Sequence, residues 1–387
     1  MKKFLALILS VAMIFALVAC GSKEGDTPNT DGDTQQTDTP AAPVDIVIAT
    51  GGTTGTYYAV GNALVTTIGD KLSLSKLTAV DSGASKANVQ LVTANQAQMS
   101  ILQSDVLNYA HNGSGGETMF DGAADKNSLW VAGVYNETVQ LVTAPSITSI
   151  EDLKGKTVCV GDVGSGTALN AAQVLEAYDM TFDDIKVMYD SFSGGAEALK
   201  NGQCDAAFTV SGAPTPALTD LATAYNFNMP SLSDEAVSYL TTNYPFLVQD
   251  NLPANTYTCV ADETVCVAVK AVFTASKDLS EDVVYEITKA MFDNQADLAN
   301  AQAKFGFLSP EGAVAGSCPA RQVQGGEDVR AGGLKHQPAD FREIELLQGV
   351  GNAVRPCDGV LDGEAHVRAA HLGQHRAVPV FHHGVHD

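Results

Sequence analysis

The chain has 387 residues and a formal net charge of −23 at pH 7, with a sequence pI near 4.5. Nucleic acids and anionic membrane surfaces would repel such a chain, so the composition argues against a partner of either kind that is held by charge. From residue 44 onward the chain is long enough for two lobes, each with its own hydrophobic core.

The N-terminus has the pattern of an export signal. Lys2 and Lys3 precede an apolar run over residues 4–18, which is short for a membrane span, and small residues follow directly before Cys20. We expect a signal peptide over residues 1–20 whose last four residues match the lipobox of bacterial lipoproteins, so that Cys20 is acylated and anchors an extracytoplasmic protein. The alternative is a cleaved signal with an incidental cysteine. Residues 21–43 are polar and predict a flexible linker.

Strands and helices then alternate, which is typical of a mostly parallel sheet with helices on both faces. The hydrophobic spacing predicts strands at 44–49, 77–81 and 99–103, helices at 60–71, 87–94 and 105–112, and two connected strands at 130–135 and 139–143. We assign residues 44–142 to a first lobe.

The same alternation restarts after residue 143. The pattern predicts a helical turn at 150–153, strands at 157–160, 185–188 and 206–210, helices at 168–178, 196–201 and 216–225, and then a loop around 245–247. We assign residues 143–264 to a second lobe. A strand at 265–275 and an amphipathic helix at 281–294, with Ser280 as N-cap, predict that residues 265–316 return to the first lobe, with the hinge near Val139 and Val265. The fold class is α/β, with two lobes and a ligand cleft between them.

Glycine-rich turns follow the first strand of each predicted lobe. Residues 49–58 read Ala-Thr-Gly-Gly-Thr-Thr-Gly-Thr-Tyr-Tyr, and residues 161–167 read Gly-Asp-Val-Gly-Ser-Gly-Thr. Free N–H groups at a helix start can bind an anion, although a plain turn with a threonine cap is the alternative for the first stretch. The second stretch lacks the lysine of a nucleotide-binding phosphate loop, so it suits a carboxylate and does not equip the chain for phosphoryl transfer.

Neither an enzyme nor a metal site is expected. No Gly-x-Ser-x-Gly, His-Glu-x-x-His or Cys-x-x-Cys motif occurs, and His111 is the only histidine before residue 336. Four cysteines follow Cys20 in the predicted lobes, and either two disulfides (159 with 204, 259 with 266) or four free thiols are compatible with the sequence.

The chain changes character after residue 316. Residues 1–316 contain 15 lysines and no arginine, whereas residues 317–387 contain six arginines, one lysine and seven of the eight histidines. We hypothesise that this tail is read out of frame, and resequencing the gene tests this: an intact single frame in several clones would contradict it. A disordered, histidine-rich extension that binds metal loosely is the alternative.

Five ordered stretches, at 51–58, 82–88, 103–105, 164–170 and 211–216, together resemble the TAXI-type solute receptors of TRAP transporters over residues 44–316. The resemblance implies a periplasmic-binding-protein-like (type II) fold with hinge strands, no cofactor, and a receptor that delivers its solute to the fused membrane subunit of a TRAP transporter. It also implies a small anionic solute, such as glutamate, glutamine or a related dicarboxylate. The ligand-binding residues that it implies are Thr53, Thr54, Gly55, Tyr57, Ser82, Ser85, Asn88, Gln103, Ser104, Gly164, Ser165, Gly166, Thr167, Asn170, Ser211, Gly212 and Ala213.

Two other functions fit the same sequence. A receptor that feeds a signalling partner would bind its ligand by the same physics, and an extracytoplasmic hydrolase would need a nucleophile and a base that the sequence does not reveal. The absence of arginine from residues 1–316 means that anion binding there must rest on backbone amides, hydroxyl groups and lysine.

Overall fold

The structure, a computed structural model, describes residues 42–115 and 119–314. The predicted signal peptide, nearly all of the linker, the acylation site Cys20 and the anomalous tail lie outside the described residues. Among the helices that are described, none is both long enough and apolar enough to cross a membrane.

The first part of the chain has the predicted order of elements. These are β1 (Val44–Ala49), α1 (Thr56–Ile68), η1 (Gly69–Lys71), β2 (Ser75–Val80), α2 (Ser85–Thr93), β3 (Met99–Gln103) and α3 (Ser104–Asn112). The strands β1 and β3 have the predicted bounds. Helices α1 and α2 begin four and two residues earlier than predicted, because their first turns are built from polar and small residues that carry no apolar periodicity.

Two long strands cross the middle of the sheet, namely β4 (Ser128–Thr143) and β9 (Thr264–Ser276). The prediction of two connected strands between 130 and 143 is wrong, because Asn136 and Glu137 do not form a turn. They pair with Lys270 and Val269 of β9, so the ladder continues through the polar pair. Register shifts between residues 130 and 135 bend the strand without breaking it.

The later elements are η2 (Glu151–Leu153), β5 (Thr157–Cys159), α4 (Gly166–Glu176), η3 (Phe182–Asp184), β6 (Lys186–Met188), α5 (Phe192–Lys200), β7 (Ala206–Ser211), α6 (Pro216–Ala224), α7 (Asp234–Asn243), β8 (Val248–Leu252), α8 (Glu281–Asp293), α9 (Gln295–Ala301), η4 (Ala303–Phe307) and α10 (Pro310–Val314). They include all those predicted and six more, namely η3, α7, β8, α9, η4 and α10. The prediction had a loop where α7 and β8 lie. Strand β8 is polar and shows no apolar alternation, and its hydrogen bonds to β9 define it.

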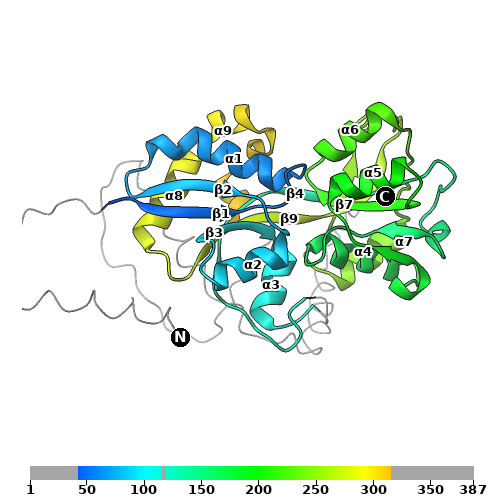
Figure 1. Ribbon diagram of the computed structural model, residues 1–387, viewed down its shortest axis with the longest axis horizontal. Coiled ribbons are helices and arrows are strands. Elements are labelled where there is room, and N and C mark those ends of the chain that lie inside the picture. The colour runs from blue at the N-terminus through cyan, green and yellow to red at the C-terminus, as the bar shows by residue number, and fades with distance from the viewer. Residues whose placement is uncertain (1–41, 116–118, 315–387) are drawn as a thin grey trace, which may run out of the picture. The chain divides into compact units, whose positions relative to one another are not determined.

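The strands form one mixed sheet in the order β2-β1-β3-β9-β4-β7-β5-β6, with β8 also paired to β9 (Figure 1). β1, β2 and β3 are parallel to one another, as are β5, β6 and β7, whereas β9 and β4 run antiparallel to their neighbours. We call the half that contains β1–β3 the first lobe and the half that contains β5–β8 the second lobe. Both lobes share β4 and β9, which confirms the predicted α/β class with strands that connect two lobes.

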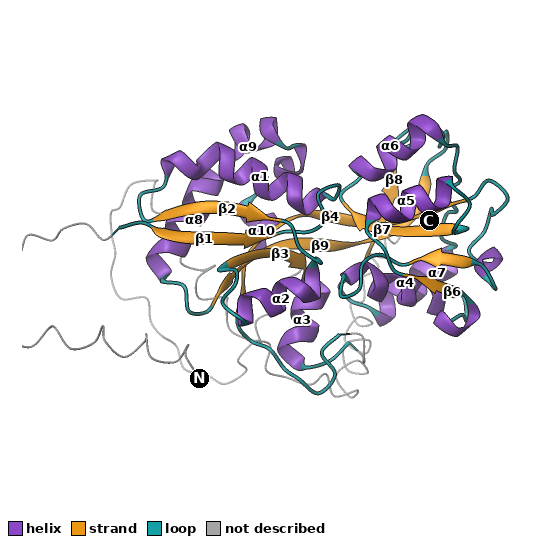
Figure 2. Cartoon of the chain, viewed as in Figure 1, coloured by secondary structure: helices purple, strands orange, loops and turns teal. Residues whose placement is uncertain are grey.

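Helices cover both faces of each lobe. In the first lobe α1, α8 and α9 lie on one face and α2 and α3 on the other, and in the second lobe α5 and α6 lie opposite α4 and α7 (Figure 2). Each lobe has a core of its own: one cluster includes Ile48, Leu64 and Ile287, and another includes Leu175 and Phe208. Because the helices bury both faces of the sheet in each lobe, the space between the lobes is bounded by strand ends and the turns that follow them.

The four cysteines of the described lobes are free thiols, so neither disulfide is formed in this structure. Cys266 lies in β9 opposite Asp250 of β8, so Cys259 is not its hairpin partner. Burial raises the pKa of Cys204 and Cys266 to about 12, which keeps both thiols protonated.

Candidate functional site

A cavity lies where the strand ends of the two lobes meet, with about 490 Å³ of empty space if its mouth is included. Its described lining is mostly small or hydroxyl-bearing and comes from both lobes. The residues are Gly51, Gly52, Thr54, Gly55, Thr56, Tyr57, Ala84, Ser85, Gln103, Glu137, Asp162, Ser165, Gly166, Thr167, Phe192, Val210 and Ser211.

Four helices begin at this cavity. The residues that precede α1, α2, α3 and α4 are Gly55, Ala84, Gln103 and Ser165, and all four line it. None of the four makes a side-chain hydrogen bond to the first turn of its helix. The helices have 9 to 13 residues, so each directs the positive end of its dipole toward the cavity. Some N–H groups of these first turns already donate within the protein, such as Thr56 N to Ser211 Oγ and Lys86 N to Gly164 O.

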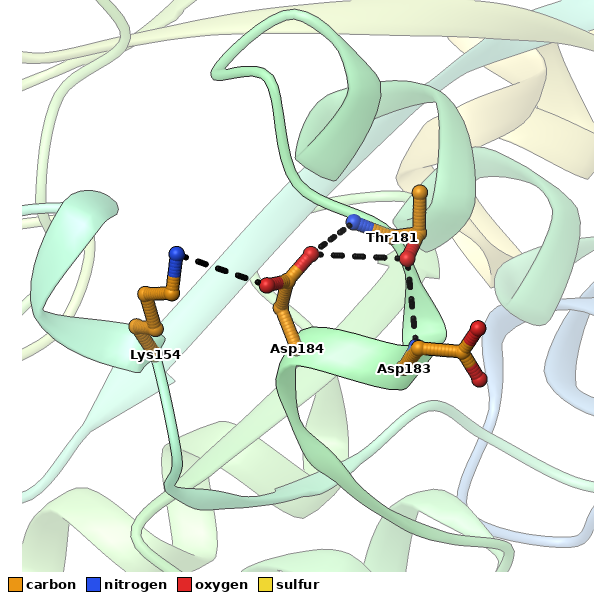
Figure 3. Close-up of polar contacts among 4 residues, drawn as sticks. All are labelled: Lys154, Thr181, Asp183 and Asp184. Atoms are coloured by element: carbon orange, nitrogen blue, oxygen red, sulfur yellow. Dashed lines mark hydrogen bonds and ion pairs between the residues drawn. The ribbon is translucent and has the colours of Figure 1, made fainter.

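Three other helices have a serine cap, whereas α6 and α9 have no side-chain cap although neither begins at the described cavity. Ser191, Ser233 and Ser280 accept hydrogen bonds from the first turns of α5, α7 and α8, at 3.1, 3.1 and 3.4 Å. At η3 the Thr181 hydroxyl accepts from Asp183 N at 3.2 Å, and Asp184 accepts from Thr181 N at 2.9 Å while Lys154 lies 3.5 Å away (Figure 3). What sets α1 to α4 apart is that four starts without a side-chain cap lie around one cavity and come from both lobes.

Two buried polar atoms at the cavity have no hydrogen-bond partner among the described residues. They are Gln103 Oε1 and Ser165 Oγ, in side chains that are 2% and 4% exposed. A buried polar atom without a partner costs about 1–3 kcal/mol, so such atoms are rare in folded proteins. One atom belongs to each lobe, and a bound solute could satisfy both.

A buried carboxyl group stands at the cavity wall. Glu137 lies on β4 and is 1% exposed; the Tyr57 hydroxyl donates to its Oε2 at 2.8 Å, and the Tyr135 hydroxyl donates to its Oε1 at 3.5 Å. Burial raises the pKa of Glu137 to about 8, although the hydrogen bond from Tyr57 opposes this change. Burial also raises the pKa of both tyrosines, so they remain donors.

A second buried acid ties the two lobes together beside the cavity. Asp105 Oδ2 accepts from Asn170 Nδ2 at 3.1 Å, and Asn170 Oδ1 accepts from Gln103 Nε2 at the same distance. Burial raises the pKa of Asp105 to about 6. Asn170 is on α4 of the second lobe, whereas its two partners are in the first, so these bonds form only when the lobes are close.

Further direct contacts hold the lobes against each other. The Thr56 hydroxyl donates to Gly212 O at 3.0 Å and accepts from Ser211 Oγ at 2.8 Å, while Lys86 N donates to Gly164 O at 3.0 Å. Lys304 Nζ also donates to the carbonyl oxygen of Ala213. The structure is thus a closed arrangement in which both turns lie at one cavity.

The wall of the cavity also contains a residue with a strained backbone conformation. Ala84, the residue before α2, has φ +63° and ψ −147°, a region that residues other than glycine rarely adopt. Such a conformation costs on the order of 1–3 kcal/mol and persists only where neighbouring structure imposes it. Strain of this kind is concentrated at binding and catalytic sites, which supports the cavity as the functional site.

The structure brings about half of the predicted ligand-binding residues to the cavity. Those that line it are Thr54, Gly55, Tyr57, Ser85, Gln103, Ser165, Gly166, Thr167 and Ser211. Of the others, Thr53 is exposed, and the described lining does not include Ser82, Asn88, Ser104, Gly164, Asn170, Gly212 or Ala213. Whether any of these residues binds a ligand stays a prediction.

Sequence reasoning did not select several lining residues, above all Glu137, Asp162 and Phe192. Glu137 was placed in a connection between strands, where an acidic side chain would be solvated. The available signal was its position inside an otherwise apolar 16-residue stretch, Ser128–Thr143.

Residues 48–321 match the NMT1-like family, and the chain belongs to this family. Among solved structures, the periplasmic aliphatic sulphonate-binding protein of Escherichia coli is similar at 15% identity, with 68% of this chain and 80% of that chain covered and a TM-score of 0.39. The alkanesulfonate-binding protein of Xanthomonas axonopodis pv. citri, bound to MOPS, matches at 13%, with coverages of 86% and 93% and a TM-score of 0.39. An ABC-transporter periplasmic substrate-binding protein of Coxiella burnetii matches at 11%, with coverages of 69% and 98% and a TM-score of 0.38.

Proposed function

We propose that the protein is an extracytoplasmic receptor that captures a small polar solute between its lobes and delivers it to the membrane subunit of a transporter. The observation that carries this proposal is the set of four uncapped helix starts, from both lobes, around one cavity. Closure over the solute would give partners to Gln103 Oε1 and Ser165 Oγ, which have none among the described residues. Binding and release, without a chemical step, are what such a site can perform.

The solute carries at least one carboxylate. Helix N-termini stabilise an anion, and hydroxyl groups of Thr54, Ser85 and Thr167 are available in the same wall. The described lining contains neither lysine nor arginine, so recognition depends on amides and hydroxyl groups. Glutamate, glutamine or a related dicarboxylate is the class that we propose, in agreement with the resemblance to TAXI-type receptors.

The partner and the anchor are proposed from the sequence. The five stretches that resemble TAXI-type receptors support a fused TRAP membrane subunit as the partner. The residues before Cys20 support a lipid anchor that keeps the receptor at the outer surface of the membrane. Ligand-binding residues 53–55, 57, 82, 85, 88, 103–104, 164–167, 170 and 211–213 remain the proposed contacts, with those at the cavity wall as the primary set.

A thermal-shift screen of the full chain with L-amino acids and dicarboxylates tests the proposal. A saturating ligand should raise the unfolding midpoint, because it binds the folded state alone, and the added solute should be recovered unchanged. Thr54→Val should weaken binding of the best solute about 3- to 10-fold, since one hydrogen bond is removed. Thr242→Val is the matched control, because Thr242 on α7 is exposed, does not line the described cavity and is not a proposed contact.

Two results would contradict the proposal. One is the absence of a shift with every solute in the panel. The other is a site outside the cavity, which would be indicated if Thr54→Val and Ser165→Ala both left the affinity unchanged.

A further inference from the structure

The wall around Glu137 presents hydrogen-bond acceptors. The carboxyl group of Glu137 accepts from two tyrosine hydroxyls, and Gln103 Oε1 lies in the same cavity without a donor among the described residues. Among the ion pairs of the described residues, none involves Glu137. This part of the cavity therefore lacks a positive charge, although the uncapped helix starts elsewhere in it suit a negative one.

We propose that Glu137 and Gln103 Oε1 form a subsite for a protonated amine, so that the solute is a zwitterionic amino acid and not a carboxylic acid that lacks an amine. The ammonium group would donate to the two acceptors, and the carboxylate would accept from N–H groups at the starts of α1 and α4. This inference deepens the proposed receptor function and rests on it. A charged pair of this kind in a water-excluded site is a strong determinant of specificity.

Proton release accompanies binding at this subsite. The groups that face Glu137 are Tyr57 on α1, Tyr135 on β4 and Gln103 at the end of β3, which are uncharged at pH 7, together with the buried acid Asp105 on α3. Asp162 lies in the second-lobe part of the wall. With a pKa raised by burial to about 8, Glu137 is mostly protonated in the unliganded cavity at pH 7. An arriving ammonium group favours the carboxylate, and the proton leaves to solvent.

The direction of the pH dependence follows. Below about pH 8, binding of an ammonium ligand releases close to one proton, so its affinity should rise with pH, by up to about tenfold per pH unit, and level off above the pKa. An acid without an amine would instead accept a hydrogen bond from protonated Glu137. Its affinity should stay level below about pH 8 and fall above it.

Isothermal titration calorimetry of the full chain with matched pairs of probes tests this inference. The pairs are L-glutamate with glutarate and L-glutamine with glutaramate, which differ only in the α-amino group. At pH 7 we expect the amino acid that binds to do so at least about 30-fold more tightly than its deaminated partner. Titrations in phosphate and in Tris, whose ionisation enthalpies differ, should give close to one proton released for each amino acid bound.

Variants separate the subsite from its surroundings. Glu137→Gln keeps the shape of the side chain and removes its charge, so it should abolish the preference for the amine and the proton release. Glu176→Gln is the matched control, because Glu176 also accepts from two tyrosine hydroxyls but does not line the described cavity, and it should leave both nearly unchanged. The wild-type proton count needs no variant and decides the question if Glu137→Gln does not fold.

The outcomes distinguish the two proposals. If glutarate binds as tightly as L-glutamate, or no proton is released on amino acid binding, the amine subsite is wrong while the receptor function stands. A preference for the amine that survives in Glu137→Gln also contradicts the subsite. If no probe of either kind binds, both the proposed solute class and the subsite are overturned.

Discussion

The turn before α1 and the turn before α4 both join a strand to a helix at the cavity, but their glycines serve different purposes. Gly161 and Gly164 have φ values of +88° and +85°, which glycine adopts without strain. None of the glycines in the first turn has a positive φ, and a Cβ atom at Gly55 would lie 3.2 Å from Gly52 O. The first turn therefore needs glycine only for close approach, whereas the second also needs it for backbone conformation.

The residues before the two helices differ in the same way. Gly55 has no side chain, so it cannot provide a side-chain cap for the first turn of α1. Ser165 has a hydroxyl group, yet this group makes no bond to α4 and has no partner among the described residues. Serine at this position normally caps its helix, as Ser233 does. Of the two turns, the second therefore has a side-chain hydroxyl, that of Ser165, with which a ligand could form a hydrogen bond.

Gly166→Ala should have the largest effect on binding. A Cβ atom at Gly166 would lie 1.5 Å from Gln103 Oε1 of the first lobe, so the two lobes could not approach as closely. We expect solute affinity, measured by calorimetry, to fall about 10- to 100-fold. Gly69→Ala is the control, since nothing lies within 4 Å of its added Cβ atom. Equal affinities for the two variants would mean that closure at Gly166 does not matter.

Gly164→Ala tests the conformational role of glycine in the second turn. Nothing lies within 4 Å of a Cβ atom there, so only the positive φ opposes alanine, and the free energy of unfolding should fall by about 1–2 kcal/mol. Gly52→Ala in the first turn also has free space but no positive φ, and its effect should be within about 0.5 kcal/mol. Urea unfolding of both ligand-free variants measures the difference, and similar losses would erase the contrast between the turns.

Ser165→Ala and Ser233→Ala should give opposite results. Removing the unpartnered hydroxyl of Ser165 breaks no bond in the protein, so stability should hold while solute affinity falls about 3- to 10-fold. Removing the cap at Ser233 should lower the free energy of unfolding by about 1 kcal/mol and leave affinity unchanged. A loss of stability in Ser165→Ala would indicate an ordinary cap and not a ligand contact.

Apolar periodicity predicted most of the fold but not all of it. Strands β1 and β3 have the predicted bounds because alternating or continuous apolar residues end sharply at polar turns. Helix α7 buries few side chains and β8 is polar, so neither has a pattern that separates it from a loop. Their positions depend on pairing and packing with β9, which lies far along the chain.

The site was harder to predict than the fold, because a sequence does not tell which way a polar side chain at a turn points. Ser82 and Asn88 stay predicted contacts of the solute, and in this structure both also bond within the protein. The Ser82 hydroxyl donates to Asn88 Oδ1 at 2.6 Å, and Asn88 Nδ2 donates to the carbonyl oxygens of Thr50 and Ile101 at 2.7 Å each. These bonds hold α2 against the strands. Glu137 was missed for the complementary reason, since its importance arises from burial that only the folded sheet creates.

The central position of β9 has a consequence for how the chain acquires its structure. In the first lobe β9 lies between β3 and β4, and Ser128 pairs with Ser276, 148 residues later (276 minus 128). The sheet of either lobe therefore lacks a shared strand until most of the described chain has been synthesised. Contacts over such separations form slowly. A newly made chain that cannot complete its sheet early stays unfolded for longer, which would suit the export that we propose.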